Sequence, residues 1–292
     1  MSARMPVVAG LVASAAIAIG AVVWMARSGA APPARCAAGM VALGPRCCGE
    51  GQCLDEAGRC AGAPARCAPG LTPTPAGCVG QSAPVRVAAG TLRLGPGDWE
   101  AQGIVERREV SVPAFSLDRV EVTEDRYAAC VAAGACAPVP LRGEPGLPVT
   151  GVTLDEAARF CAFAGGALPS RDQLAFAGAG PAGRRYPWGD TGAVCRRVAF
   201  GLREGPCGEG AAGPDLAGSR PAGASPEGIL DLAGNVAEWT APDDPGGRSA
   251  GVADVVGGSW ADAGAPALRT WNRRLVPVDA RAPDVGFRCA YR

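Results

Sequence analysis

The stretch Gly228-Ile-Leu-Asp-Leu-Ala-Gly-Asn-Val-Ala-Glu-Trp239 decides how the rest of the chain is interpreted. It places two carboxylates, Asp231 and Glu238, on one tight loop. Two carboxylates and two backbone carbonyls on such a loop are oxygen ligands that suit a hard cation. The alternative is that Glu238 only caps backbone amides. The stretch therefore predicts either a cation site or a structural turn.

The sequence around this stretch, from residue 85 to the C-terminus, has short periodic segments separated by frequent Gly and Pro. Apolar and polar residues alternate at 85–87 and 109–112, which predicts strands. Helical features occur in three segments: the i, i+3, i+4 spacing in Thr123–Val131, the capping box Thr153-Leu-Asp-Glu156 whose helix ends at Gly165-Gly166, and the span from Ser170 to Gly178. We expect the remainder to be loop and short strand.

The composition excludes several kinds of catalytic site. The chain has 292 residues and no histidine, and arginine supplies all 28 of its cationic side chains, since lysine is absent. Without histidine there is no Ser-His-Asp or Cys-His nucleophile pair and no His-ligated metal. Without lysine there is no Schiff base and no phosphate-binding P-loop lysine. The formal net charge is zero and no basic run carries interleaved aromatic residues, so nucleic acid is not an expected partner.

The N-terminus carries an uncharged apolar run from Met5 to Met25, flanked by Arg4 and Arg27. This run is long enough to cross the hydrocarbon core of a bilayer as a helix. We therefore expect residues 1–27 to be a signal anchor in a bacterial-type inner membrane. The alternative is a secretory signal that is cleaved, which would leave a secreted or periplasmic protein. Because the chain has 13 cysteines, we place the remainder outside the cytoplasm.

A segment rich in Cys, Pro and Gly, residues 28–84, follows the expected anchor and contains seven cysteines. So short a segment buries little apolar surface, and disulfides would have to hold it. We interpret it as a disulfide-tied stalk. Because seven is odd, one thiol is free, bonds to the following domain or pairs between chains. Residues 85–292 contain six cysteines, which can pair completely.

Seven short strings occur in order along the second domain. They are Phe115–Thr123, Pro148–Cys161, Gly165–Ala177, Arg185–Asp190, Gly228–Trp239, Gly257-Gly-Ser-Trp260 and Gly286-Phe-Arg-Cys289. Together they resemble the formylglycine-generating enzyme family, whose domain is also called the sulfatase-modifying factor domain. The resemblance covers about residues 85–292.

This resemblance implies an α+β fold related to C-type lectins, with little regular secondary structure. It implies a disulfide between Cys161 and Cys289. It also implies that the loop Asp231–Glu238 is a structural Ca²⁺ site. Its ligands would be Asp231, the carbonyls of Gly234 and Val236, and Glu238.

The sequence departs from the enzymes of this family where their chemistry takes place. In the aerobic enzymes, two cysteines shortly after the Gly-Gly-Ser string bind Cu(I) and oxidise a sulfatase cysteine to formylglycine. This chain has no cysteine between Cys207 and Cys289, so we expect no copper. Alignment backwards from Asn272 places Trp271 and Pro266 at the copper positions. Cys195 and Cys207 are expected to form a local disulfide rather than a substitute pair.

Two other uses of the fold lead to different expectations. Iron-dependent sulfoxide synthases of this fold need histidine ligands, which the chain lacks. Ligand display, as in lectin-like variable proteins, needs no catalytic residue. We therefore expect a non-catalytic module that binds a peptide, a glycan or an envelope protein; the alternative is a divergent formylglycine-generating oxidase. The candidate ligand-binding residues are Trp260, Arg269, Trp271, Asn272 and Arg273, since Trp and Arg often anchor partners. The alternative is that the tryptophans are core and the arginines solvated.

Overall fold

The computed structural model describes most of the chain beyond residue 39. The described residues are 40–43, 46–56, 60–67, 71–75, 77–80, 83–95, 107–208, 210–242 and 251–292. The predicted anchor at residues 5–25 lies outside them. Within the described ranges, no helix is long and apolar enough to span a membrane.

The cysteine-rich segment forms three two-stranded antiparallel ladders. Their strands are β1 (Met40–Leu43) with β2 (Arg46–Gly49), β3 (Cys53–Leu54) with β4 (Cys60–Ala61), and β5 (Leu71–Thr74) with β6 (Gly77–Gly80). Disulfides Cys48–Cys60 and Cys67–Cys78 cross-link these short strands, as expected for a segment with little core. Cys53 is exposed and forms no disulfide with a described residue. Cys36 and the side chain of Cys47 lie outside the described part.

Three α-helices occur among the described residues, all of them beyond residue 107, and two of them begin at complete capping boxes. They are α1 (Glu124–Ala132), α2 (Leu154–Phe163) and α3 (Arg171–Ala179). At α2 the Thr153 hydroxyl accepts from the Glu156 amide at 3.3 Å, and the Glu156 carboxylate accepts from the Thr153 amide at 2.9 Å. Ser170 and Gln173 do the same for α3. These reciprocal bonds confirm the predicted helix starts.

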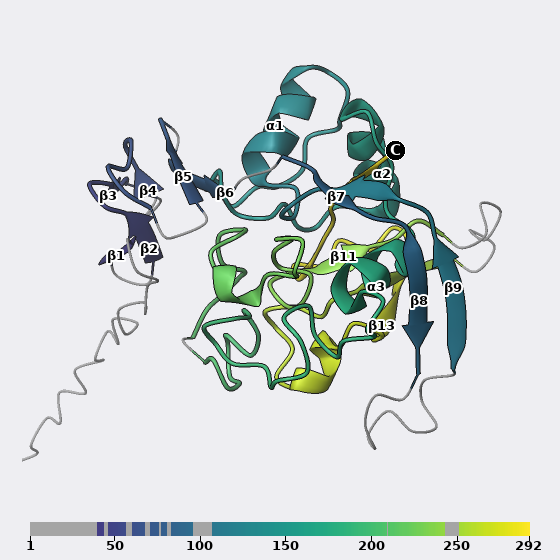
Figure 1. Cartoon of the computed structure of the whole chain (residues 1–292). Helices are drawn as coiled ribbons and strands as arrows, with labels where there is room; N and C mark the ends of the chain where they lie inside the picture. The colour runs from purple at the N-terminus through teal and green to yellow at the C-terminus, as the bar shows by residue number, and fades with distance from the viewer. Residues whose placement is uncertain are drawn as a thin grey trace, which may run out of the picture. The chain divides into compact units, whose positions relative to one another are not determined.

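The strands of this domain form small sheets that join distant parts of the sequence (Figure 1). One sheet has the order β13-β12-β11-β14, with β11 (Ala237–Trp239), β12 (Val252–Val256), β13 (Arg273–Pro277) and β14 (Val285–Gly286). A second has the order β15-β10-β7, with β7 (Val85–Val87), β10 (Phe115–Leu117) and β15 (Ala290–Tyr291). A hairpin of β8 (Gly90–Leu94) and β9 (Arg108–Val112) packs against α3. The described residues also include two short 3₁₀ helices, Pro221–Gly223 and Ala265–Leu268.

An aromatic core lies between the first two helices and the C-terminal strands. Phe160 stacks on Tyr127 with ring centroids 5.8 Å apart and meets the edge of Phe287 at 5.5 Å. The disulfide Cys161–Cys289 belongs to the same cluster, and both sulfur-bearing residues are fully buried. It ties α2 to the C-terminus across a sequence separation of 128 residues. The pairing implied by the family resemblance is therefore present.

Candidate functional site

The string Gly286-Phe-Arg-Cys289 places a cation in the interior. The Arg288 side chain is fully buried, and it donates from two nitrogens to the two carboxylate oxygens of Glu238, each at 2.7 Å. It also donates to the backbone carbonyls of Asp118 at 3.2 Å and Leu230 at 2.9 Å. Strand β11 runs parallel to β14 with Glu238 opposite Gly286, and this register brings the two side chains together. A planar guanidinium has five N–H donors and can therefore form all of these hydrogen bonds at once.

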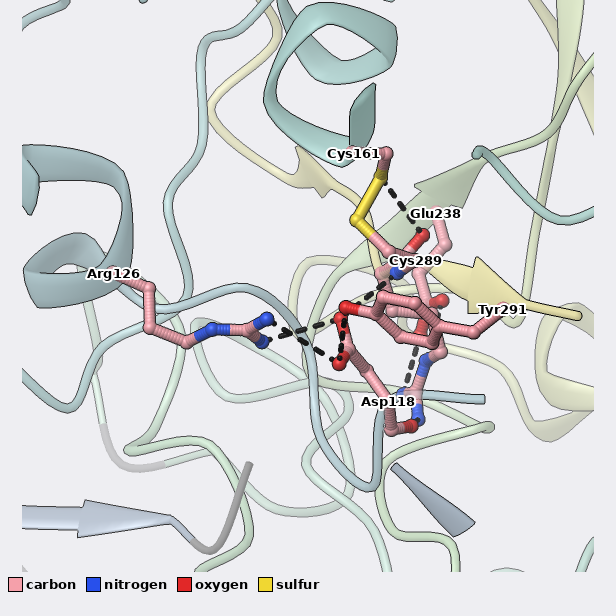
Figure 2. The surroundings of a disulfide bond; sticks show 7 residues. Asp118, Arg126, Cys161, Glu238, Cys289 and Tyr291 are labelled. Carbon is pink, nitrogen blue, oxygen red and sulfur yellow. Dashed lines mark hydrogen bonds and ion pairs between the residues drawn. A yellow bond between two sulfur atoms is a disulfide. The ribbon is translucent and has the colours of Figure 1, made fainter. Parts of the chain in front are cut away.

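A second acidic group, Asp118, connects this cluster to the disulfide (Figure 2). Its carboxylate accepts the Cys289 amide at 3.0 Å and the Tyr291 hydroxyl at 3.1 Å. Arg126 of α1 forms an ion pair with it at 3.2 Å. Burial, followed by the charge of Asp118, raises the pKa of Tyr291 to about 12. The hydroxyl therefore stays protonated and remains a donor to Asp118.

A third acidic group, Glu121, is fully buried, and neither carboxylate oxygen has a hydrogen-bond partner. Burial, and then the charge of Asp231, raises the pKa of Glu121 well above its ordinary value. Burial also raises the pKa of Asp231, although the Gly218 amide donates to that carboxylate. The cluster thus holds more carboxyl groups than Arg288 can neutralise, which favours protonation of Glu121.

The loop that carries Asp231 owes its shape to residues that accept a positive φ. Asp231, Gly234 and Asn235 have φ values of 54°, 76° and 57°. Asp, Asn and Gly are the residues that enter this region with least strain. The loop is fixed because the Asn235 carbonyl accepts from the Trp260 amide at 2.8 Å. The sequence Asp-Leu-Ala-Gly-Asn therefore encodes a turn that presents Glu238 to Arg288.

The predicted calcium ligands lie beside a buried guanidinium in this structure. Both oxygens of Glu238 are engaged by Arg288, and a guanidinium at 2.7 Å repels a cation. Within the described residues, no group of three or more Asp, Glu, Cys or His side chains is arranged to hold a metal. Asp231, Gly234 and Val236 share the loop, but Glu238 is directed elsewhere. Calcium binding stays a prediction.

The segment after Gly257-Gly-Ser-Trp260 is where the family's copper cysteines would lie. Here it contains Asp262, whose carboxylate accepts from the Ser259 amide at 2.7 Å, and a short 3₁₀ helix. The segment 195–207 lies beside this one, because the Gly201 amide donates to the Asp262 carbonyl at 2.7 Å. It carries two cysteines. They are Cys195 and Cys207, and they are joined in a disulfide. The prediction of a local disulfide is confirmed.

The predicted ligand-binding residues differ widely in exposure. Trp260 is only 1% exposed and Arg269 8% exposed, so neither offers much surface to a partner. Trp271, whose ring lies 5.8 Å below the Arg269 guanidinium, is half-buried, as is Asn272. Arg273 is exposed and pairs with Asp254 at 2.7 Å. The accessible part of the predicted set is thus Trp271, Asn272 and Arg273.

No role was predicted from the sequence for Asp118, Glu121 or Arg288, although all three lie in the strings that resemble the family. A signal was present for two of them, because each is a charged residue between apolar neighbours: Glu121 lies between Val120 and Val122, and Arg288 between Phe287 and Cys289. A charged residue among apolar neighbours is rarely buried without a partner. The partner of Arg288, Glu238, lies 50 residues away in the sequence, so the sequence could indicate that Arg288 is unusual but could not identify its partner.

Comparison with known proteins supports the family resemblance found in the sequence. Residues 74–292 match the family model described as a sulfatase-modifying factor enzyme 1-like domain. The inactive C-alpha-formylglycine-generating enzyme 2 of Mus musculus is 33% identical over 153 residues, which is 49% of each chain. The formylglycine-generating enzyme of Streptomyces coelicolor is 29% identical over 170 residues, or 51% of this chain and 54% of that enzyme. The chain thus spans about half the length of the curated relatives it matches.

Solved structures share the fold at low sequence identity. PvdO from Pseudomonas aeruginosa aligns with a TM-score of 0.56 at 20% identity, over 71% of this chain and 93% of PvdO. Variable protein 1 of Treponema denticola aligns with the same TM-score and identity, over 72% and 94% of the two chains. These likenesses show the fold alone. Since the family model covers most of the sequence, the chain belongs to the sulfatase-modifying factor family.

Proposed function

We propose that this protein presents its sulfatase-modifying factor domain outside the cytoplasm, on an N-terminal membrane anchor, as a non-catalytic module. The module binds a peptide, a glycan or a protein of the cell envelope. One observation carries the proposal: the segment after Ser259 supplies a carboxylate and apolar side chains instead of two thiols. Oxygen ligands do not suit Cu(I), which prefers thiolates.

Two further observations support the proposal. The described residues contain five disulfides, which is typical of proteins in oxidising compartments. Two of the curated relatives carry the word inactive in their names, in Mus musculus and Bos taurus. Each match spans about half of both chains.

A second candidate function is a divergent formylglycine-generating oxidase. The specific observation in its favour is the match to the Streptomyces coelicolor enzyme at 29% identity. The oxidase would need a pair of thiols near the segment after Ser259. The only cysteines that the described residues place there are Cys195 and Cys207, which would first have to be reduced.

The decisive experiment is mass spectrometry of a sulfatase-type Cys-x-Pro-x-Arg peptide after incubation with the purified protein, copper and oxygen. We expect an unchanged peptide, with an authentic formylglycine-generating enzyme converting it in parallel. A product with the mass and aldehyde reactivity of formylglycine would overturn the proposal. In that case the variant with Cys195→Ala and Cys207→Ala would show whether this pair had replaced the missing thiols.

A further inference from the structure

The loop from Cys195 to Cys207 separates its apolar and charged residues. Its sequence is Cys-Arg-Arg-Val-Ala-Phe-Gly-Leu-Arg-Glu-Gly-Pro-Cys, closed by the disulfide. Val198, Phe200 and Leu202 are each at most 2% exposed and belong to the hydrophobic cluster that contains Trp260. The loop is therefore anchored by its apolar side chains, while Arg196 and Arg203 are exposed and Arg197 is half-buried.

Hydrogen bonds fix the backbone of this loop at several points. The Leu202 amide donates to the Trp260 carbonyl at 3.0 Å, and the Ala199 carbonyl accepts from the Asn235 amide at 2.8 Å. At the start of the loop, Arg220 donates to the Cys195 carbonyl. A loop held this firmly loses little conformational entropy when it binds a ligand, which favours affinity.

The arginines of this loop have no carboxylate partner among the described residues. Arg196 is exposed and Arg197, half-buried, donates only to the Thr191 hydroxyl at 2.6 Å. Arg203 is exposed and its guanidinium lies over the ring of Trp260, 5.2 Å from the centroid. Glu204 is the one acidic residue in the loop. The loop thus presents three cations with unsatisfied donors.

Other arginines of the described residues, including Arg220 beside this loop, contrast with the loop arginines because each forms an ion pair with a carboxylate. Arg220 pairs with Asp215, Arg273 pairs with Asp254, and a further pair joins Arg274 to Asp284 at 2.8 Å. In a chain whose acidic and basic residues balance at 28 each, three arginines without a carboxylate partner on one short loop are a local departure from neutrality. Local positive charge of this kind matches a negatively charged ligand.

We propose that the Cys195–Cys207 loop is the recognition surface for a short acidic segment, rich in Asp or Glu, of a partner protein. The guanidinium forks of Arg196, Arg197 and Arg203 bind carboxylates bidentately. A short segment fits better than a long polyanion, because the balanced charge of the chain provides no extended basic track. This inference rests on the proposed binding function and assigns the binding site and the partner's chemistry.

The test measures the binding of a fluorescently labelled peptide of alternating Asp and Gly to the full-length protein in detergent, by anisotropy. The loop variant carries Arg196→Gln, Arg197→Gln and Arg203→Gln. A matched control carries Arg86→Gln and two companion changes, Arg107→Gln and Arg159→Gln, at exposed arginines that form no ion pair with a described residue. Both variants lose the same charge. Each preparation is accepted only if mass spectrometry finds the Cys195–Cys207 disulfide intact.

We expect the loop variant to bind the peptide about tenfold more weakly than the wild type, and the control to bind within about twofold of it. Replacement of the three loop arginines by lysine keeps the charge and should still weaken binding, because the bidentate fork is lost. No binding by the wild type, or equal loss in both Gln variants, would refute the proposal. Binding of a sulfated oligosaccharide in place of the peptide would refute the choice of partner. The formylglycine assay is independent, so failure of the proposed non-catalytic function would be recognised separately.

Discussion

Two disulfides of the second domain allow a quantitative test of what ties this fold together. Cys161–Cys289 closes a sequence separation of 128 residues, whereas Cys130–Cys136 closes one of 6. All four half-cystines are at most 7% exposed, so replacement by alanine removes the same atoms from similar surroundings. The comparison of the two double variants therefore cancels most of the packing cost and leaves the effect of loop length.

The chain-entropy model gives the expected difference. At 25 °C it predicts about 4.9 kcal/mol for the longer loop and about 2.2 kcal/mol for the shorter one, a difference of about 2.7 kcal/mol. The assay is equilibrium unfolding in urea without reductant, on the variants Cys161→Ala/Cys289→Ala and Cys130→Ala/Cys136→Ala. Equal losses in the two variants, or a larger loss in the second, would show that loop closure is not the source of the stabilisation.

Three further predictions concern the interior. Arg288→Met leaves buried carboxylates without their cation and should lower the free energy of unfolding by about 3–5 kcal/mol, measured by urea denaturation. The control Arg86→Met, at an exposed arginine that forms no ion pair with a described residue, should stay close to the wild type, and equal effects would contradict the reasoning. Because burial raises the pKa of Glu121 well above 4.5, the folded state holds a proton that the unfolded chain releases, so stability falls as the pH rises beyond 4.5. Glu121→Gln should flatten that fall in denaturation curves taken across this pH range, and an unchanged slope would exclude Glu121 as its source. Gly234→Ala should lower the melting temperature, because a Cβ there would lie 2.5 Å from the Ala199 carbonyl oxygen at a φ of 76°, and an unchanged melting temperature would contradict it.

Local features of the fold could be predicted from the sequence, and the reason is visible at Thr153. Its capping box involves residues three apart, so the sequence alone contains both partners. The parallel pairing of β11 with β14 joins residues nearly 50 apart, and no local pattern specifies it. The role of Arg288 depends on that pairing, since its partner Glu238 comes from β11. The charge cluster therefore became visible only with the three-dimensional structure.

The predicted ligand-binding residues also show which properties follow from the local sequence and which depend on distant residues. The sequence alone shows that the segment after Gly257-Gly-Ser-Trp260 contains no cysteine before Cys289. The burial of Trp260 depends on its packing against Leu202 and on Arg203 above its ring, which come from a loop some 57 residues earlier in the chain. The alternative interpretation of the tryptophans as core thus holds for Trp260, while Trp271 stays half-exposed.

The arrangement also explains how one scaffold can carry different surface chemistry. The groups that hold the domain together, Arg288 with Glu238 and Asp118 with the Cys161–Cys289 disulfide, lie in the interior between β10, β11 and the C-terminal strands. The segment that follows Ser259 forms no part of that cluster and is held by its own bonds to Asp262. Because the two regions share no ion pair among the described residues, a change in the polar side chains after Ser259 removes none of the ion pairs of the buried cluster. The same independence leaves the Cys195–Cys207 loop free to vary its exposed residues, provided that Val198, Phe200 and Leu202 keep it anchored.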